Sequence, residues 1–120
     1  MRNKIAISKN FVLSEFECHC CGRVMLDSIL LKKLQELRNK INGEIYIISG
    51  YRCEKHNASV GGVKNSQHLR GKAADIHARN YPLGNLLEAA ENIGFGGIGT
   101  YLTKGFLHLD VRKGRARWTE

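Results

Sequence analysis

Apolar residues recur every three or four positions between residues 27 and 43, and this spacing predicts an amphipathic helix. The apolar positions of this segment are Leu30, Leu31, Leu34, Leu37 and Ile41. Gly43 follows them and fits the C-terminal end of the helix. A second helix is expected from Pro82, which suits a first helical turn, to Asn92, and Gly94 would end it.

The remaining apolar segments are short, rich in β-branched and aromatic residues, and predict strands. These segments are residues 44–49, 72–77, 97–102 and 106–111. The turn at 103–105 joins the last two strands into a hairpin, whereas residues 50–66, rich in Gly and Asn, are expected to form a long loop. Ser14, with Glu17 three residues later, predicts a short helix that begins with a capping box. The pattern therefore predicts an α+β fold in which helices pack on a small antiparallel sheet with a C-terminal hairpin.

Composition limits the chain to one domain, which we place at residues 1–120. Hydrophobic residues make up 42% and charged residues 25%, both normal for a globular protein, and a single proline leaves no room for a linker. No apolar run approaches the roughly 18 residues that cross a bilayer, and the first residues lack an apolar core of signal-peptide length. We therefore expect a monomer without a membrane span. It would be cytoplasmic as synthesised and would need release or another export route to act outside the cell.

The net charge is +8, with 19 Lys and Arg against 11 Asp and Glu. Such a field attracts polyanions, which could be nucleic acid or the anionic polymers of a bacterial cell wall. Four basic residues gather near the end of the sequence: Arg112, Lys113, Arg115 and Arg117. This group is equally consistent with a solvated basic tail, so charge alone does not choose the partner.

Two histidines and two aspartates are candidate metal ligands. His68 and Asp75 flank a six-residue insert that contains one glycine and ends in two alanines, which suits close packing. The last predicted strand alternates, so His108 and Asp110 project from one of its faces. Catalytic zinc takes about three ligands from His, Asp or Glu and leaves a position for water, and His68, Asp75 and His108 fit this number. Asp110 would then support a ligand or transfer protons. The alternative for His68 and Asp75 is that they are ordinary polar residues near a turn.

Four motifs follow one another along the chain. They are "SGYR" (49–52), "SQHLRGKAADI" (66–76), "GGIGTY" (96–101) and "FLHLDVR" (106–112), closed by Trp118. With them, roughly residues 11–118 resemble the zinc D-Ala-D-Ala carboxypeptidase family, which includes phage endolysins and murein endopeptidases, and above all its short single-domain subgroup. The resemblance implies the fold of Hedgehog and D-Ala-D-Ala peptidases and a zinc cofactor bound by His68, Asp75 and His108.

The same resemblance implies hydrolysis of amide bonds in peptidoglycan stem peptides or cross-links, by a carboxypeptidase, an endopeptidase or a phage or prophage endolysin. Zinc would polarise the scissile carbonyl and lower the pKa of its water, while a carboxylate accepts the proton. In the family, the arginine of "SGYR", here Arg52, holds a carboxylate of the peptide substrate, which a guanidinium can bind with two hydrogen bonds. Ser66 is expected to contact the substrate or a ligand, or to bond the loop backbone.

One position departs from the family. Many members carry an acidic general base three residues before the last zinc histidine, and Gly105 occupies that position here. Asp110 is the candidate to replace the base, but it could equally be a carboxylate that orients a ligand histidine. His77 is a weaker candidate, because alternation from Asp75 directs it to the same face of the strand.

The cysteines gather unusually closely, with three of the four in "CHCCG" (18–22) and the fourth directly after Arg52. Without a secretory signal, paired thiols suggest a metal rather than a disulfide. A second, structural zinc ion would take its ligands from this group: Cys18, Cys21 or Cys20, Cys53, and His19 or His56. A disulfide, for a protein acting outside the cell, and free buried thiols are the alternatives.

Two other functions account for parts of the sequence. A catalytically silent, zinc-containing wall-binding domain would not need an acid at position 105. A basic nucleic-acid-binding zinc module would use the cysteines and the charge, but it would leave His68, Asp75 and His108 without a purpose. We therefore expect peptidoglycan peptides and anionic wall polymers as partners, and no nucleic acid.

Overall fold

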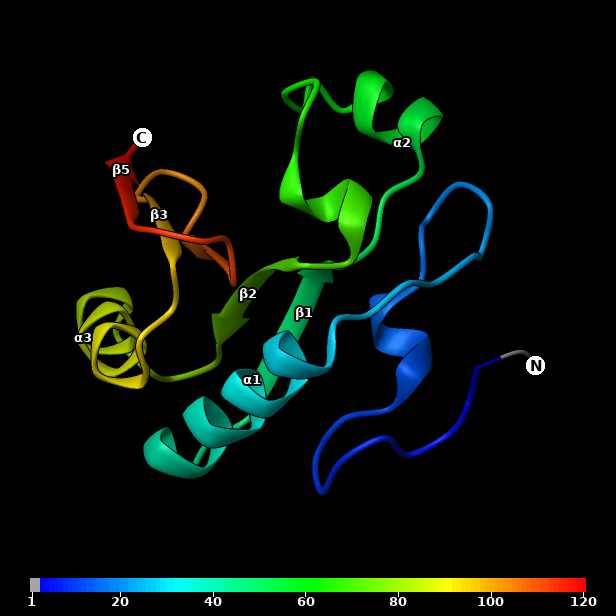
Figure 1. The fold of residues 1–120 in the computed structure, drawn as a ribbon. Helices are drawn as coiled ribbons and strands as arrows, with labels where there is room; N and C mark the ends of the chain where they lie inside the picture. Colours follow the sequence, from blue (N-terminus) through cyan, green and yellow to red (C-terminus); the bar gives the residue numbers. More distant parts are fainter. Residues whose placement is uncertain (1–2) are drawn as a thin grey trace.

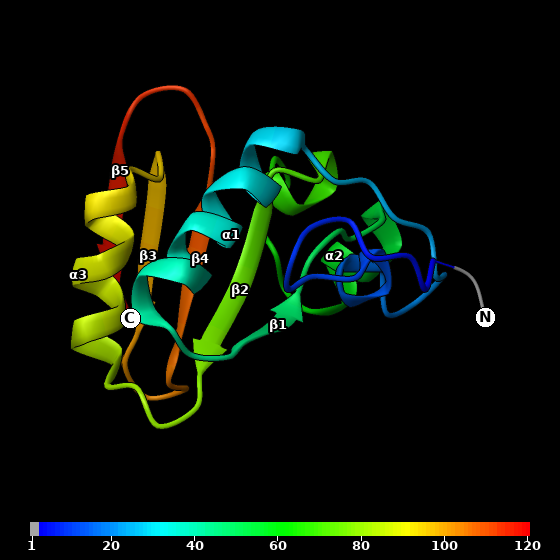
Figure 2. The same cartoon turned by 90° about the horizontal axis from the view of Figure 1, so that it is seen from below.

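Two helices cover one face of a five-stranded sheet in the computed structural model, which describes residues 3–120 (Figure 1, Figure 2). The strands are β1 (Ile45–Ser49), β2 (Ala73–Ala78), β3 (Gly97–Tyr101), β4 (Phe106–Asp110) and β5 (Ala116–Thr119). The α-helices are α1 (Ser28–Ile41), α2 (Glu54–Ser59) and α3 (Leu83–Ile93), and the 3-10 helices are η1 (Leu13–Phe16) and η2 (Gln67–Arg70). The α+β fold expected from the sequence is confirmed. Within the described residues, none of the helices has the length and apolar character that a bilayer crossing requires.

Both long helices begin and end close to the expected residues. Asp27 caps α1, because its carboxylate accepts the N–H groups of Ile29 and Leu30 at 2.8 and 3.3 Å. Asn42, in the left-handed conformation with φ 49°, ends α1 one residue before the glycine expected to do so. Helix α3 ends at Gly94, as predicted.

The sheet has the order β1-β2-β4-β3-β5. The first four strands pair antiparallel, and the predicted hairpin of β3 and β4 is confirmed. Strand β5 pairs parallel with β3, so the sheet is mixed. The alternative of a solvated basic tail holds only in part. Lys113 and Arg115 are exposed, but Arg117 lies in β5, and its guanidinium donates to the Glu91 carboxylate at 2.8 and 2.9 Å.

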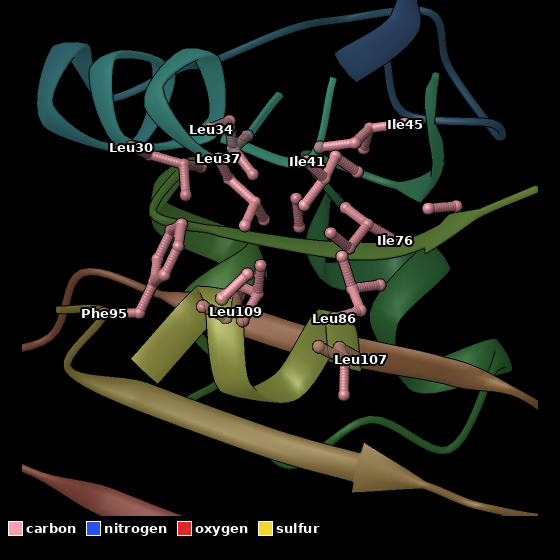
Figure 3. Packing of buried hydrophobic residues seen from close by; sticks show 14 of the residues in the cluster. Leu30, Leu34, Leu37, Ile41, Ile45, Ile76, Leu86, Phe95, Leu107 and Leu109 are labelled. Carbon is pink, nitrogen blue, oxygen red and sulfur yellow. The ribbon is translucent and has the colours of Figure 1, made fainter. Parts of the chain in front are cut away.

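The hydrophobic core lies between the helices and the sheet. Figure 3 shows Leu30, Leu34 and Leu37 of α1 directed toward Leu109 of β4 and Phe95. Every second residue of β2 and β4 joins this core, so the alternate residues of both strands project from the opposite face, which the two helices leave open.

The segment before α1 packs beside the end of β1. Phe11 and Phe16 are buried there, and the Phe16 carbonyl accepts the Tyr51 N–H at 2.9 Å. The predicted Ser14 cap is wrong. Helix η1 has Val12 as its N-cap, two residues before Ser14, and the Val12 N–H donates to the Glu15 carboxylate at 2.8 Å.

The expected long loop 50–66 contains the short helix α2, and η2 follows it. Gly71 ends η2 with φ +68°, and its carbonyl accepts the Asp27 N–H at 2.9 Å. A Cβ at this position would collide with the backbone carbonyl of Met25. This contact joins the start of α1 to η2.

Gly71→Ala is expected to destabilise the protein more than Gly114→Ala. Both glycines have left-handed backbones, φ +68° and +79°, but no atom lies within 4 Å of a Cβ at Gly114. The left-handed strain of about 1–2 kcal/mol is common to both variants, and overpacking adds about 1–3 kcal/mol at Gly71 alone. Chemical unfolding measures the difference, and equal losses would contradict the role assigned to this contact.

Candidate metal centre

Three different elements supply the candidate ligands. His68 lies in η2, Asp75 in β2 and His108 in β4. Asp75 and His108 are directly opposite each other in the antiparallel pair, so their side chains project from the same, helix-free face of the sheet. Helix η2 carries His68 over this face, and all three side chains are buried.

The three side chains converge on one point. Asp75 Oδ1 lies 3.2 Å from His68 Nε2 and 3.1 Å from His108 Nδ1. One ligand atom from each residue lies within 4.8 Å of the other two. The predicted set His68, Asp75 and His108 is therefore brought together.

The outer contacts of the two rings decide which nitrogen faces the cluster. His68 Nδ1 lies 2.7 Å from the Gly50 carbonyl, which can only accept, so Nδ1 carries the hydrogen and Nε2 is left with a lone pair. His108 Nε2 donates in the same way to Asp110 Oδ2 at 2.7 Å, which leaves the lone pair on Nδ1. In the neutral rings, two lone pairs and a carboxylate oxygen then face one another, an arrangement that repels unless a ring proton or a metal ion lies between them. The residues present fit a divalent metal ion.

The ionisation of the cluster agrees with this demand for positive charge. Burial alone would raise the pKa of Asp75, but hydrogen bonds with His108 and His68 outweigh it and lower the pKa. Burial alone would lower the pKa of His108, but hydrogen bonds with Asp110 and Asp75 raise it, so the ring favours its protonated, positively charged form beside Asp75. A metal ion would take the place of that proton on Nδ1. The cluster therefore holds an ionised carboxylate and attracts a cation.

Arg52 contacts the second oxygen of the central carboxylate. Its Nη2 donates to Asp75 Oδ2 at 3.1 Å, while Nε donates to Ser49 Oγ at 3.1 Å and Nη1 to Asn57 Oδ1 at 3.2 Å. Its side chain is 14% exposed. Arg52 thus orients a ligand, a contact that the sequence did not indicate.

Asp110 lies behind His108 rather than beside the other ligands. It is fully buried, and it accepts hydrogen bonds from the Arg112 guanidinium at 2.7 to 3.1 Å and from the Arg112 N–H at 3.1 Å. Burial alone would raise the pKa of Asp110, but the hydrogen bonds with His108 and Arg112 outweigh this effect and lower the pKa. Of the two roles left open by the sequence, these contacts favour support of His108.

Two other candidates have contacts that explain them structurally. Ser66 Oγ accepts the His68 N–H at 3.1 Å and caps η2, which favours the expected bond to the loop backbone. The His77 ring stacks on Tyr46 with a centroid distance of 5.1 Å.

The ligands form the floor of a cavity of about 440 Å³. Its walls include basic and aromatic side chains and one acid apart from the ligands: Arg52, Lys104, Arg112, Tyr101, Phe106, Trp118 and Glu120. Glu120 was not named from the sequence, and Trp118, which closes the set of motifs, was given no role in the site, because the segment that carries them is too short to predict as a strand.

Two glycines of β3 make room for this wall. A Cβ at Gly97 would collide with the Asp110 carboxylate, and one at Gly99 with the Trp118 indole. The alternation of glycines in "GGIGTY" is the signal that could have indicated large side chains packed over this strand.

A second cluster joins Cys18 to Cys53. Their sulfur atoms lie 3.7 Å apart, and Cys21 lies with them, each sulfur within 4.8 Å of the others. Burial raises the pKa of the Cys18 thiol, but hydrogen bonds from the backbone of Cys53, Cys20 and Cys21 outweigh it and lower the pKa to about 7. The three cysteines named from the sequence are therefore brought together as well.

The two buried imidazoles and the aspartate could together hold one metal ion, and they line a cavity. The sequence model of the family described as Peptidase M15 matches residues 9–110, which include all of these ligands, and the chain belongs to this family. The resemblance recognised in the four motifs is confirmed.

Several characterised or named proteins are similar to the chain. The probable peptidoglycan L,D-endopeptidase MepK of Haemophilus influenzae is 37% identical over 94 residues, 72% of this chain and 50% of that protein. Peptidoglycan L,D-endopeptidase MepK of Escherichia coli K12 is 36% identical over 76 residues, 59% of this chain and 42% of that protein. The zinc D-Ala-D-Ala carboxypeptidase of Streptomyces albus G is 37% identical over 68 residues, 56% of this chain and 27% of that protein. The chain spans half or less of the length of these relatives.

Asp110→Asn is expected to weaken zinc affinity by about 10- to 100-fold, because the amide removes the carboxylate that orients His108. Competition with a chromogenic chelator measures the affinity. Glu91→Gln is the matched control, since it removes a carboxylate that is paired with an arginine but lies outside the candidate centre, on α3. Unchanged affinity in Asp110→Asn would contradict the supporting role and favour the proton-transfer alternative.

Proposed function

We propose that the protein is a zinc metallopeptidase that hydrolyses amide bonds in the peptides of peptidoglycan. The observation that carries the proposal is the His68, Asp75 and His108 cluster on the floor of an accessible cavity. Membership in the peptidase M15 family supports it, as do relatives named for peptidoglycan endopeptidase and zinc carboxypeptidase activity.

Zinc suits the donor set because it binds imidazole nitrogen and carboxylate oxygen readily. His68 Nε2, His108 Nδ1 and Asp75 would hold it, which leaves a coordination position for water or substrate. Bound there, zinc would polarise a scissile carbonyl and lower the pKa of a water molecule.

The residues around the ligands fix their positions. Asp110 holds the His108 ring by its Nε2–H, and the Gly50 carbonyl holds His68 by its Nδ1–H. Arg52 holds the second oxygen of Asp75. Such contacts keep the ligand lone pairs directed at one point, so little reorganisation is needed when the metal binds.

The cavity walls suit a peptide that carries a carboxylate. Arg52, Lys104 and Arg112 supply positive charge on the walls, and Tyr101 stacks on Phe106 with a ring-centroid distance of 4.5 Å. A guanidinium can bind a substrate carboxylate with two hydrogen bonds and thereby position the scissile amide. The stem peptides of peptidoglycan offer such carboxylates.

Proton transfer needs an acid other than the one the family places at position 105. Gly105 has φ +74° and forms the β3–β4 turn. Asp110 is bonded to His108 and Arg112. Apart from the candidate ligand Asp75, the carboxylate side chain that lines the cavity is that of Glu120. We assign proton transfer to Glu120, and Glu120→Gln with normal zinc content should hydrolyse at least about 100-fold more slowly if this is so.

Digestion of purified peptidoglycan sacculi tests the function. The wild-type chain loaded with zinc should release soluble peptides that mass spectrometry identifies, and the same products would show which bond is cut. His68→Ala should lose both the zinc at this centre and the products. His77→Ala is the control and should retain both, because His77 lies on β2 with Asp75 but stacks on Tyr46. Binding to sacculi without any product would favour the silent wall-binding alternative and contradict the proposal.

Arg52→Lys is expected to abolish the preference for substrates with a free carboxylate, since lysine cannot form the bidentate contact. Hydrolysis of a stem peptide should fall by about 10- to 100-fold, while its amidated analogue should be affected less. Arg70→Lys, an exposed arginine of η2, is the control. If Arg52→Lys preferred the free acid over the amidated peptide as strongly as the wild type does, the proposed contact between Arg52 and the substrate carboxylate would be contradicted.

A further inference from the structure

The cysteine cluster lies outside the proposed catalytic centre and has no part in its chemistry. Cys18 is buried, Cys53 is half-buried and Cys21 is exposed. The Cys18 and Cys53 sulfur atoms are 3.7 Å apart, and all three sulfur atoms lie within 4.8 Å of one another. Residues distant in sequence thus converge on a second point.

A tight turn brings two of these cysteines together. The Gly22 N–H donates to the Cys18 carbonyl at 2.9 Å, and the Cys18 N–H donates to the Arg23 carbonyl at 2.7 Å. Gly22 has φ +74°, which lets the chain reverse directly after Cys21. The result is a C-x-x-C turn of the spacing found in structural zinc sites.

The third cysteine enters from the segment after β1. The Cys53 N–H donates to Cys18 Sγ at 3.4 Å, and Cys53 Sγ accepts the His56 N–H at 3.4 Å. Backbone amides therefore point at both sulfur atoms. Such amides stabilise thiolates and are typical of the surroundings of metal-bound sulfur.

The spacing of the sulfur atoms distinguishes a metal from a disulfide. Zn–S bonds of about 2.3 Å at tetrahedral angles place two ligand sulfur atoms about 3.8 Å apart. The observed 3.7 Å agrees with this value, whereas disulfide sulfur atoms are about 2.05 Å apart. Two free thiols in contact lie at a similar distance, so the argument against them is the third sulfur, Cys21, which converges with the other two, together with the amides directed at Cys18 and Cys53.

We propose that Cys18, Cys21 and Cys53 bind a structural zinc ion, distinct from the catalytic one. The fourth ligand comes from the neighbouring side chains of Cys20, His19 or His56. The His19 and His56 rings lie against each other with a centroid distance of 5.6 Å. Four ligands close the site to substrate, as structural zinc requires.

This ion would fasten the N-terminal segment to the segment that carries Arg52. Cys53 follows Arg52 directly, and the Gly50 carbonyl that orients His68 lies three residues before it. The proposal goes beyond the catalytic function and does not depend on it, because the cluster shares no ligand with the catalytic centre.

Cobalt substitution tests the site in the intact chain of 120 residues. Thiolate bound to Co²⁺ gives a near-ultraviolet charge-transfer absorption that a centre of imidazole and carboxylate ligands does not give. The wild type should show this band, and His68→Ala should retain it, so that failure of the catalytic centre cannot be mistaken for failure of this one. The band should disappear in Cys53→Ser, which keeps a side chain able to cap α2. Its persistence in Cys53→Ser, or its absence from the wild type, would overturn the proposal.

Zinc release from the wild type gives a second measurement that does not depend on the folding of a variant. Titration of the zinc-loaded chain with a mercurial thiol reagent should release about one ion per chain, and His68→Ala should release the same amount. Replacement of His19, Cys20 or His56 in turn identifies the fourth ligand by the loss of cobalt absorption. Thiol titration that releases no zinc, or an intact mass two hydrogens below that of the reduced chain, would establish free thiols or a disulfide instead.

Discussion

A buried carboxylate that must be surrounded by positive charge organises this molecule. Asp75 lies on a central strand, with one oxygen facing two imidazoles and the other facing the Arg52 guanidinium. Burying a carboxylate without partners costs several kcal/mol, so the elements that carry these partners must be held in place. Helix η2, strand β4 and the segment after β1 all converge on this one side chain.

Strand pairing and the contacts behind the ligands together hold these partners around Asp75. Pairing of β2 with β4 places Asp75 opposite His108, but it leaves the imidazole free to rotate. Asp110 removes that freedom, and Arg112 in turn neutralises Asp110, which would otherwise be a buried charge without a cation. Groups of opposite charge thus alternate outward from Asp75, through His108 and Asp110 to Arg112.

The predictable part of the site is the part encoded by local pattern. Strand alternation placed His108 and Asp110 on one face, and the motif resemblance joined His68 to Asp75. Alternation cannot say on which side of an imidazole a carboxylate lies, so the role of Asp110 needed the structure. The strand β5 and helix α2 were missed for a related reason: each is too short for periodicity, and β5 is formed by its pairing with β3 and by the bond from Arg117 to Glu91.

The segment that carries Arg52 shows why a second anchor is useful. Its apolar side chains Val60 and Val63 are 52% and 72% exposed, so the hydrophobic core contributes little to holding it. Helix α2, with six residues, is too short to be stable by itself. The segment is instead held by polar contacts: Arg52 with Asp75 and Asn57, and the Cys53 N–H with Cys18. The backbone of Arg52 is itself held, because its N–H donates to the His68 carbonyl at 3.1 Å and the Tyr51 N–H donates to the Phe16 carbonyl at 2.9 Å. The residues after Arg52 have fewer such contacts, so a bond from the next residue, Cys53, to the N-terminal segment holds the chain at the point where the exposed loop begins.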